Sequence, residues 1–252
     1  MIRTATEKLT RKMCFRRRLP HDFGYNPVWV SPSAGLRFLF TRMKEIDPAL
    51  FNLAREFVHK EDVVWDVGAN VGLFAFSSAY LSGSRGLVVA LEADAWLVQL
   101  LRRSSLRQSA TSAPVHIIPA GVAQSVDLRT FQIAARSRST NSLDGYGSTQ
   151  TGGIAEKQIV VTVSLDWLCE RYVLPDVLKI DVEGAELEVL QGAEILFKRK
   201  RPILLCEVSS ENATEVTRLL LSKGYRLYDG DVSKEERKEL SSAPWNTIAI
   251  PA

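Results

Sequence analysis

The chain has 252 residues, of which 46% are hydrophobic and 24% charged, and its formal net charge is +3. This composition is typical of a globular protein, and the length fits one α/β domain with an extension. No apolar run approaches the roughly 20 residues of a membrane-spanning helix, and no secretory signal or CxxC pair is present, so we expect a cytoplasmic protein without a disulfide framework or structural zinc.

Basic residues are concentrated at the N-terminus. Residues 1–18 contain seven cationic residues and one acidic residue, a net of +6, which leaves −3 for the remainder. This segment can form a helix with Ile2, Leu9 and Met13 on one side. The segment could contact a membrane, an acidic partner or RNA. The alternative is a solvated terminus without a role. We divide the chain into a basic extension and cap segment, 1–50, and a main domain, 51–252.

From residue 48 onward, predicted helices and strands alternate. The first half of the domain consists of a helix over 48–58, a strand over 63–67, a helix over 71–82, a strand over 86–93, a helix over 94–109 with Asp94 as its N-cap, and a strand over 115–120. Two alternating segments, 126–133 and 159–165, predict a hairpin. The residues 134–158 between them are rich in Ser, Thr and Gly, which predicts a flexible loop and a candidate lid.

The second half continues the pattern with a strand over 177–182, a helix over 185–200, a strand over 202–209, a helix over 212–222 and strands over 225–229 and 246–251. Apolar strands that alternate with helices predict a Rossmann-like, mostly parallel sheet with helices on both faces. In such sheets the ligand lies beyond the carboxyl ends of the strands.

The loop after the first strand, in "VVWDVGANVGLFAF", has the spacing Asp66-x-Gly68-x-Asn70-x-Gly72. Its glycines allow a sharp turn and a close approach to a ligand, and the next helix directs free N–H groups to the same place. Asp66 would repel the pyrophosphate of a dinucleotide but attract a cation. S-adenosylmethionine carries an ammonium and a sulfonium group, and it therefore suits this loop.

The next strand ends at Glu92, whose carboxylate can accept hydrogen bonds from two ribose hydroxyls. Taken alone, Asp66 could be a turn residue and Glu92 a surface acid. Their placement after two consecutive strands favours a nucleoside site.

Three ionisable residues alternate in "KIDVEGAE": Lys179, Asp181 and Glu183. If the strand continues through them, their side chains point to one side. The structural alternative is that an acid caps the following helix. The functional alternative is general-base catalysis, with Asp181 as the first candidate, Glu183 as the second, and Lys179 as the orienting cation. His116 is expected to be a strand residue without a role.

A divalent metal is a further alternative, because Asp181, Glu183 and Glu207 could converge on a magnesium-type ion. The chain lacks a tight cluster of ligands, so no metal is expected.

Two stretches, "VVWDVGANVGLFAF" followed by "LEAD" and the segment 164–208 with its core "LKIDVEGAELEVLQGA", resemble class I S-adenosylmethionine-dependent methyltransferases, and the FkbM family in particular. The resemblance covers residues 60–210. It implies a seven-stranded sheet with an antiparallel last strand, and methyl transfer to a hydroxyl on a sugar, polyketide or other natural product. It also implies that the cofactor's methionine part lies near Asp66, Gly68, Asn70 and Gly72, its ribose at Glu92, and its adenine near Ala93, Asp94, Gly121 and Val122.

We therefore expect an S-adenosylmethionine-dependent methyltransferase that acts on a hydroxylated small molecule. An RNA or protein methyltransferase is the alternative within enzymes. The Asn/Asp-Pro-Pro-Tyr/Phe element of amino-methylating nucleic-acid enzymes is replaced here by "DVEG" at 181–184, so a nucleic-acid partner is not expected. A non-catalytic nucleotide-binding module is the alternative from another class.

Overall fold

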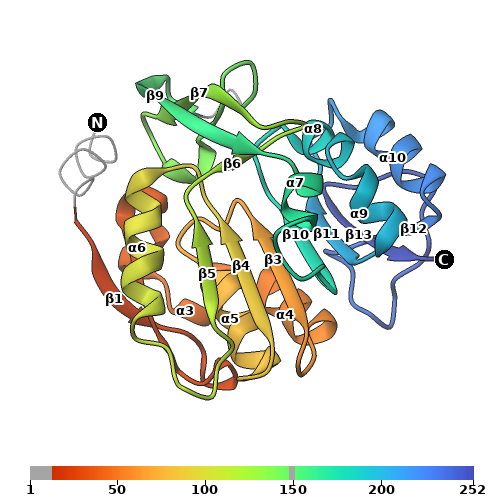
Figure 1. The fold of residues 1–252 in the computed structure, drawn as a ribbon. Helices are drawn as coiled ribbons and strands as arrows, with labels where there is room; N and C mark the ends of the chain where they lie inside the picture. The colour runs from red at the N-terminus through yellow and green to blue at the C-terminus, as the bar shows by residue number, and fades with distance from the viewer. Residues whose placement is uncertain (1–12, 148–150) are drawn as a thin grey trace.

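The computed structural model describes residues 13–147 and 151–252, and its centre is a seven-stranded sheet (Figure 1). The strand order is β12-β13-β11-β10-β3-β4-β5, and β13 is antiparallel to both of its neighbours while the remaining pairs are parallel. This confirms the predicted fold class and its antiparallel last strand. The strands are β3 (Val63–Val67), β4 (Leu87–Leu91), β5 (Val115–Ile118), β10 (Val177–Ile180), β11 (Ile203–Glu207), β12 (Tyr225–Asp229) and β13 (Asn246–Pro251).

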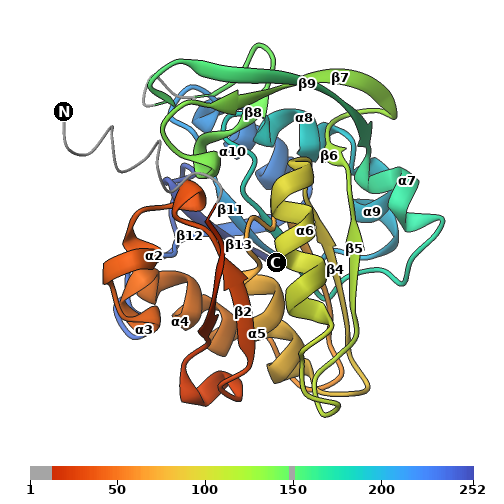
Figure 2. The same cartoon turned by 90° about the vertical axis from the view of Figure 1, so that its left-hand side faces the viewer.

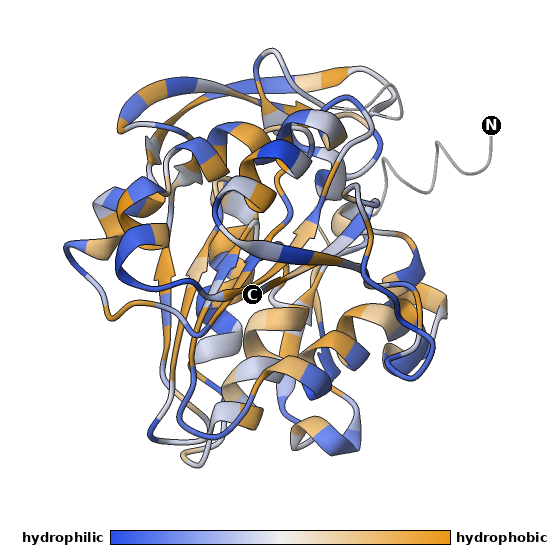
Figure 3. Cartoon of the chain, turned by 90° about the vertical axis from the view of Figure 1, so that its right-hand side faces the viewer, coloured by the Kyte–Doolittle hydropathy of each residue, from blue (hydrophilic) through white to orange (hydrophobic). Residues whose placement is uncertain are grey.

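Helices cover both faces of this sheet, and the core is divided into two layers. Successive strand residues alternate between the layers: Val64 packs in one cluster and Trp65 in the other. Each large buried side chain contributes about 1.5–3 kcal/mol relative to an exposed one. Figure 3 shows mostly apolar strands at the centre, surrounded by helices in which apolar and polar residues alternate. One layer contains α4 (Pro48–Phe57), α5 (Leu73–Ser82) and α6 (Ala95–Ser105), and the other contains α7 (Leu165–Cys169), α8 (Glu186–Gln191), α9 (Glu194–Arg199) and α10 (Ala213–Ser222).

The helix predicted over 185–200 is in fact two helices, α8 and α9. The break lies at Gly192, where a Cβ atom would lie 2.8 Å from the carbonyl oxygen of Ala123, so the chain passes too close for a continuous side-chain-bearing helix. The carboxylate of Asp166 then accepts hydrogen bonds from the N–H groups of Ile195 and Leu196, which caps the second helix. None of the helices in the described residues is long and apolar enough to cross a membrane.

A second, four-stranded sheet lies above the carboxyl ends of the central strands (Figures 1 and 2). Its long strands pair antiparallel, as the hairpin prediction required. The intervening segment is more ordered than the predicted loop, because it contains a 3-10 turn, a strand and the start of the next strand. Residues 148–150 of that prediction lie outside the described residues. The elements are β6 (Gly121–Val122), β7 (Asp127–Ala134), η3 (Arg138–Thr140), β8 (Ser142–Leu143) and β9 (Ile154–Val163), in the order β6-β9-β7-β8.

The N-terminal part begins with strand β1 (Phe15–Arg18), which pairs antiparallel with β2 (Pro27–Val30). The predicted helix is therefore wrong for these residues, because Arg16 and Arg18 point outward while Phe15 and Arg17 are partly buried, a period of two. Ile2 and Leu9 lie outside the described residues. Strand β2 packs against α6, and short helices lead from it into α4: η1 (His21–Phe23), η2 (Pro32–Ala34), α2 (Arg37–Phe40) and α3 (Met43–Ile46).

Candidate active site

Loops from three central strands border one cleft with an empty volume of about 580 Å³. The loops follow β3, β4 and β10, and residues of the second sheet close the cleft from above. The predicted site residues that line it are Gly68, Asn70, Glu92, Ala93, Gly121, Val122, Asp181 and Glu183.

The backbone of the first loop is held by the neighbouring strand. The N–H groups of Gly68 and Ala69 both donate to the carbonyl of Leu91 at 3.0 Å. Gly68 has a φ of +75°, and a Cβ on it would lie 1.8 Å from the carbonyl oxygen of Asp181, so glycine is required. Gly72 lies behind the cleft as the N-cap of α5, with a φ of +86°, and shapes the loop without lining the cleft.

Glu92 lies at the end of β4, as predicted, and is 7% exposed. Its two carboxylate oxygens accept hydrogen bonds from the N–H groups of Asn70 and Asp94, both at 2.8 Å. Burial raises the pKa of Glu92 to about 7, although these N–H groups lower it. Each oxygen retains a lone pair for a further donor, which fits a ribose with two hydroxyls.

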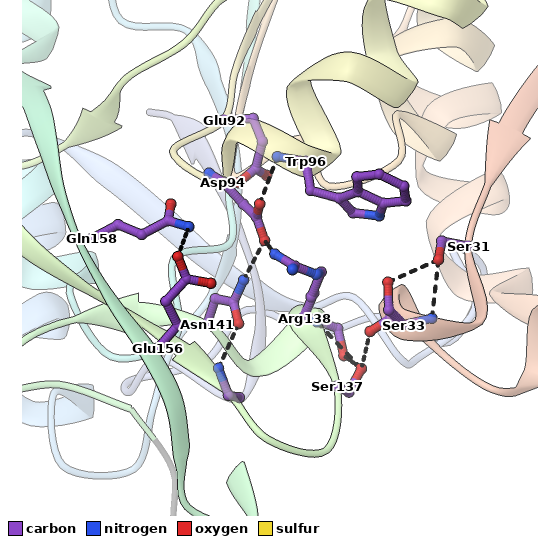
Figure 4. Close-up of polar contacts among 12 residues, drawn as sticks. Ser31, Ser33, Glu92, Asp94, Trp96, Ser137, Arg138, Asn141, Glu156 and Gln158 are labelled. Atoms are coloured by element: carbon purple, nitrogen blue, oxygen red, sulfur yellow. Dashed lines mark hydrogen bonds and ion pairs between the residues drawn. The ribbon is translucent and has the colours of Figure 1, made fainter. Parts of the chain in front are cut away.

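Asp94 is fully buried but does not line the cleft (Figure 4). One carboxylate oxygen accepts from the N–H of Trp96 at 2.8 Å, which confirms the predicted N-cap of α6. The other accepts from Nδ2 of Asn141 at 2.8 Å and forms an ion pair with Arg138. Asp94 thus acts on the cleft through the two residues that it holds.

Residues 137–147, which we call the roof, cover the cleft. Besides Arg138 and Asn141 at Asp94, Tyr146 donates from its hydroxyl to Glu188 on α8 at 2.6 Å. Ser137 reaches the carbonyl of Ser33 at 3.5 Å on the N-terminal side (Figure 4). The predicted candidate lid, 134–158, includes the roof, but the sequence singled out none of its residues. Their Ser- and Gly-rich surroundings indicate only a loop, and their partners lie far away in the chain.

A second cleft of about 800 Å³ adjoins the first through Gly68, Asn70, Asp181 and Glu183, which line both. Asp66 lines it, is 1% exposed, and neither of its carboxylate oxygens accepts a hydrogen bond from the described residues. Burial raises the pKa of Asp66, and the ammonium of Lys179, at 3.5 Å, opposes that rise. The buried amide oxygen of Asn70 is likewise without a partner.

Lys179 connects the carboxylates, because its ammonium also lies 3.3 Å from Asp181. Burial alone would lower the pKa of Lys179, but the carboxylates of Asp181 and Asp66 raise it above its usual value. Lys179 therefore stays protonated and holds both acids in place.

Glu183 lines the cleft from a turn, whereas the strand pattern predicts that it lies in a strand. Strand β10 ends at Ile180, and Glu183 lies in a turn with a φ of +53°, so the predicted alternation through it is wrong. Neither Asp181 nor Glu183 caps α8; its N-cap, Ala185, makes no side-chain bond. Burial and the neighbouring carboxylates raise the pKa of Glu183 to about 8.

Glu207, at the end of β11, faces the same second cleft. Burial and repulsion by Asp181 raise its pKa to about 7. The acids nevertheless do not form a ligand set: in the described part of the chain no group of three His, Cys, Asp or Glu side chains is arranged to hold a metal ion. His116 is exposed on β5, where its ring meets the edge of Tyr172.

The arrangement fits a cationic nucleoside. No described residue donates a hydrogen bond to the oxygens of Asp66 and Asn70, although Lys179 lies 3.5 Å from Asp66, so these oxygens can accept from a ligand. The acids around them create a negative potential that attracts positive charge. Glu92 supplies the acceptors for two vicinal hydroxyls. We use the term acidic cleft for the region formed by Asp66, Lys179, Asp181, Glu183 and Glu207.

Comparison with known proteins gives a consistent result. Residues 66–227 match the family model of the methyltransferase FkbM domain. A hexuronic acid methyltransferase, AglP, of Haloferax volcanii is 27% identical over 173 residues, which cover 68% of this chain and 66% of that protein, just under two thirds of its length.

Solved structures of similar fold have low sequence identity. A methyltransferase FkbM from Methylobacillus flagellatus KT has a TM-score of 0.48 at 15% identity, with 79% of this chain and 49% of that chain covered. Aeropyrum pernix fibrillarin, solved with S-adenosyl-L-methionine, has a TM-score of 0.45 at 13% identity, with 77% and 67% covered.

Proposed function

The chain belongs to the FkbM family of S-adenosylmethionine-dependent methyltransferases, and from this premise we propose that it methylates a hydroxyl oxygen of a small, sugar-like acceptor. The observation that carries the proposal is the position of Glu183. Its side chain lines the cleft that fits the nucleoside, the adjoining acidic cleft and a third cleft beside Tyr146 and Trp245. A carboxylate at this junction can accept a proton from an acceptor that meets the methyl donor there.

The residues that would hold the cofactor are those whose oxygens can accept further hydrogen bonds. Asp66 and Asn70 would bind the ammonium of its amino-acid part, and Glu92 would bind the ribose hydroxyls. Ala93, Gly121 and Val122 provide an apolar wall for the adenine. When bound, S-adenosylmethionine supplies a methyl group activated by the positive charge of its sulfur.

Glu183 suits the role of general base better than Asp181, the first candidate from the sequence. Asp181 is bound to Lys179, whereas no hydrogen bond ties the carboxylate of Glu183 to the described residues. The pKa of Glu183, about 8, lies near neutrality, where proton transfer is most effective. We assign Asp181 and Lys179 to orientation of the acceptor.

In this assignment Glu183 would accept the hydroxyl proton of the acceptor, and bound S-adenosylmethionine would supply the methyl group, with its carbon–sulfur bond as the one that breaks. The cleft walls contribute by holding the oxygen in line with the breaking bond. The positive φ of Glu183 and of Asn70, which lines the same clefts, is consistent with a functional site, because strained backbone conformations cluster at active sites.

The third cleft, with an empty volume of about 1030 Å³, supports the acceptor class. Its lining combines Tyr146 and Trp245 with hydrogen-bonding side chains of Ser209 and Asn212, which suits a polyhydroxylated molecule. The name of the Haloferax relative, a hexuronic acid methyltransferase, points to the same class. A nucleic acid is less suited, because the carboxylates around this cleft would repel its phosphates.

Two measurements test the proposal. Calorimetry should show binding of S-adenosylhomocysteine and no comparable binding of NAD. Incubation with S-adenosylmethionine and a panel of hexosides should then give products with one added methyl on oxygen, detected by mass spectrometry and absent with Glu183→Gln. Methylation of RNA in preference to every hexoside, or tight binding of NAD alone, would refute the proposal.

A further inference from the structure

A surface groove on the N-terminal side of the molecule gathers positive charge. Its walls come from β1, the turn that leads into β2, α3 and α4, which lie together in Figure 2. Its empty volume is about 1420 Å³. We call it the basic groove and define it by Arg16, Arg18, Tyr25, Arg42, Lys44 and Arg55.

The charges of the groove are poorly balanced. Its lining holds six Arg and Lys residues and, among the described residues, a single acid, Asp22. Asp22 is already paired with Arg55, through Nε at 2.5 Å. Arg16, Arg42 and Lys44 are exposed and have no hydrogen-bond or ion-pair partner in the described chain.

The shape of the groove depends on Arg17, which is not free. Its guanidinium donates to the carbonyls of Phe38 and Thr41, the latter at 2.7 Å, and so fixes α2 and the start of α3 beside β1. This contact holds β1 and α2 side by side in one wall. It therefore keeps the unpaired Arg16 of β1 close to Arg42 and Lys44, which follow α2. Like charges assembled in a concave surface raise the local potential and attract a polyanion.

Apolar side chains lie next to these charges. Phe40, between the two carbonyls that Arg17 binds, is 83% exposed, and Met13, just before β1, is 51% exposed. Such an aromatic beside several cations is typical of surfaces that rest in the headgroup layer of a membrane.

The aromatic ring within the groove is not available for stacking on a nucleic acid base. Tyr25 stacks on His21 with 4.3 Å between ring centroids, and the guanidinium of Arg18 lies 4.9 Å from the Tyr25 centroid. A single-stranded nucleic acid would need free aromatic faces in the groove itself. The exposed aromatic Phe40 does not line the groove and lies two residues before Arg42 in the chain, which favours a lipid surface.

We propose that the basic groove docks the protein onto the surface of an anionic lipid bilayer. Arg16, Arg42 and Lys44 would bind headgroup phosphates and carboxylates, and Phe40 would enter the headgroup layer. None of the residues that line the groove lines the acidic cleft or the clefts that adjoin it. Docking would therefore leave the proposed active site accessible to its acceptor.

Flotation of the full chain with vesicles tests this inference. We expect binding to vesicles of 30% phosphatidylserine in phosphatidylcholine at 0.1 M salt and little binding to pure phosphatidylcholine. Each basic side chain near an anionic membrane contributes about fivefold to partitioning. The triple variant Arg16→Glu, Arg42→Glu and Lys44→Glu should therefore lose on the order of 100-fold. Phe40→Ala should lose about tenfold.

A matched control changes the same number of charges elsewhere: Arg226→Glu, Lys234→Glu and Lys238→Glu, all exposed and outside the groove. This variant should keep most of its vesicle binding. Equal losses in both triple variants would show that net charge alone is responsible and would overturn the proposal. So would the absence of vesicle binding, or groove-dependent binding of a single-stranded RNA oligonucleotide that exceeds vesicle binding. Binding of S-adenosylhomocysteine should be unchanged in the groove variant, which separates this test from that of the proposed function.

Discussion

The acidic cleft and the basic groove each gather several side chains of one charge around a single counter-charge, Lys179 in the cleft and Asp22 in the groove, but burial makes them different kinds of site. In the cleft, Glu183 and Glu207 are partly buried and lie close to other acids, and their pKa values rise to about 8 and about 7. In the groove, Arg16, Arg42 and Lys44 are exposed, and water and salt screen their repulsion. A buried cluster therefore has altered proton affinities that chemistry can use, whereas an exposed one offers mainly long-range attraction.

The largest effect is expected from a substitution that removes proton transfer by Glu183 in the acidic cleft. Glu183→Gln keeps the shape of the side chain but removes the proton acceptor, so turnover should fall by about 10²- to 10⁴-fold. Affinity for S-adenosylhomocysteine, measured by calorimetry, should change little. In the wild type, kcat/KM should rise with pH toward about 8, because the base works in its deprotonated form.

The matched control for that experiment is Glu211→Gln, an exposed acid that lines the third cleft. It should retain nearly full turnover. A similar loss in both variants would mean that the negative potential, and not proton transfer by Glu183, supports the reaction.

A smaller effect is expected from Asp66→Asn. Loss of a charge-assisted hydrogen bond should weaken binding of S-adenosylmethionine and S-adenosylhomocysteine by about 10- to 100-fold. Asp22→Asn, an equivalent change in the basic groove, should leave cofactor affinity unchanged by calorimetry. If Asp66→Asn binds the cofactor as tightly as the wild type, the carboxylate of Asp66 does not bind the cofactor.

The roof offers a third test. Arg138→Ala removes one of the residues that Asp94 holds, whereas Asn141 and the helix cap remain. Dissociation of S-adenosylhomocysteine in stopped-flow experiments should accelerate by about tenfold, as expected for the loss of one ion-paired hydrogen bond. Arg136→Ala, an exposed change just before the roof, should have little effect. Equal acceleration in both variants would argue that the ion pair between Arg138 and Asp94 does not hold the roof over the cleft.

The smallest effect concerns stability. Glu92, Glu183 and Glu207 have raised pKa values, so between about pH 4.5 and 8 the folded protein binds protons that the unfolded chain has released. Stability without ligand should therefore fall as pH rises through this range. We expect Tm to drop by about 5 °C. The double variant Glu183→Gln and Glu207→Gln should flatten this drop, and an unchanged slope would contradict the pKa assignments.

Much of the central architecture was predictable from local patterns. Apolar runs such as 63–67 and 246–251 indicate strands regardless of context, and the boundaries of the strands and most helices were nearly correct. The acids at the ends of consecutive strands had to meet, because parallel strands end at one edge of the sheet. The helix over 185–200 was predicted wrongly, since the close passage of the chain at Gly192 is a tertiary contact.

By itself, then, the sequence determined the doubly covered sheet and the edge at which Asp66, Glu92 and Asp181 gather, because strand periodicity and chain order are local properties. Tertiary structure alone decided that Asp94 binds a roof residue 44 positions away, that Glu183 enters the cleft through a turn, and that Arg17 assembles a groove from separate elements. Hydrogen bonds and ion pairs between residues distant in the chain depend on how whole elements pack, and the periodicity of the sequence does not predict them.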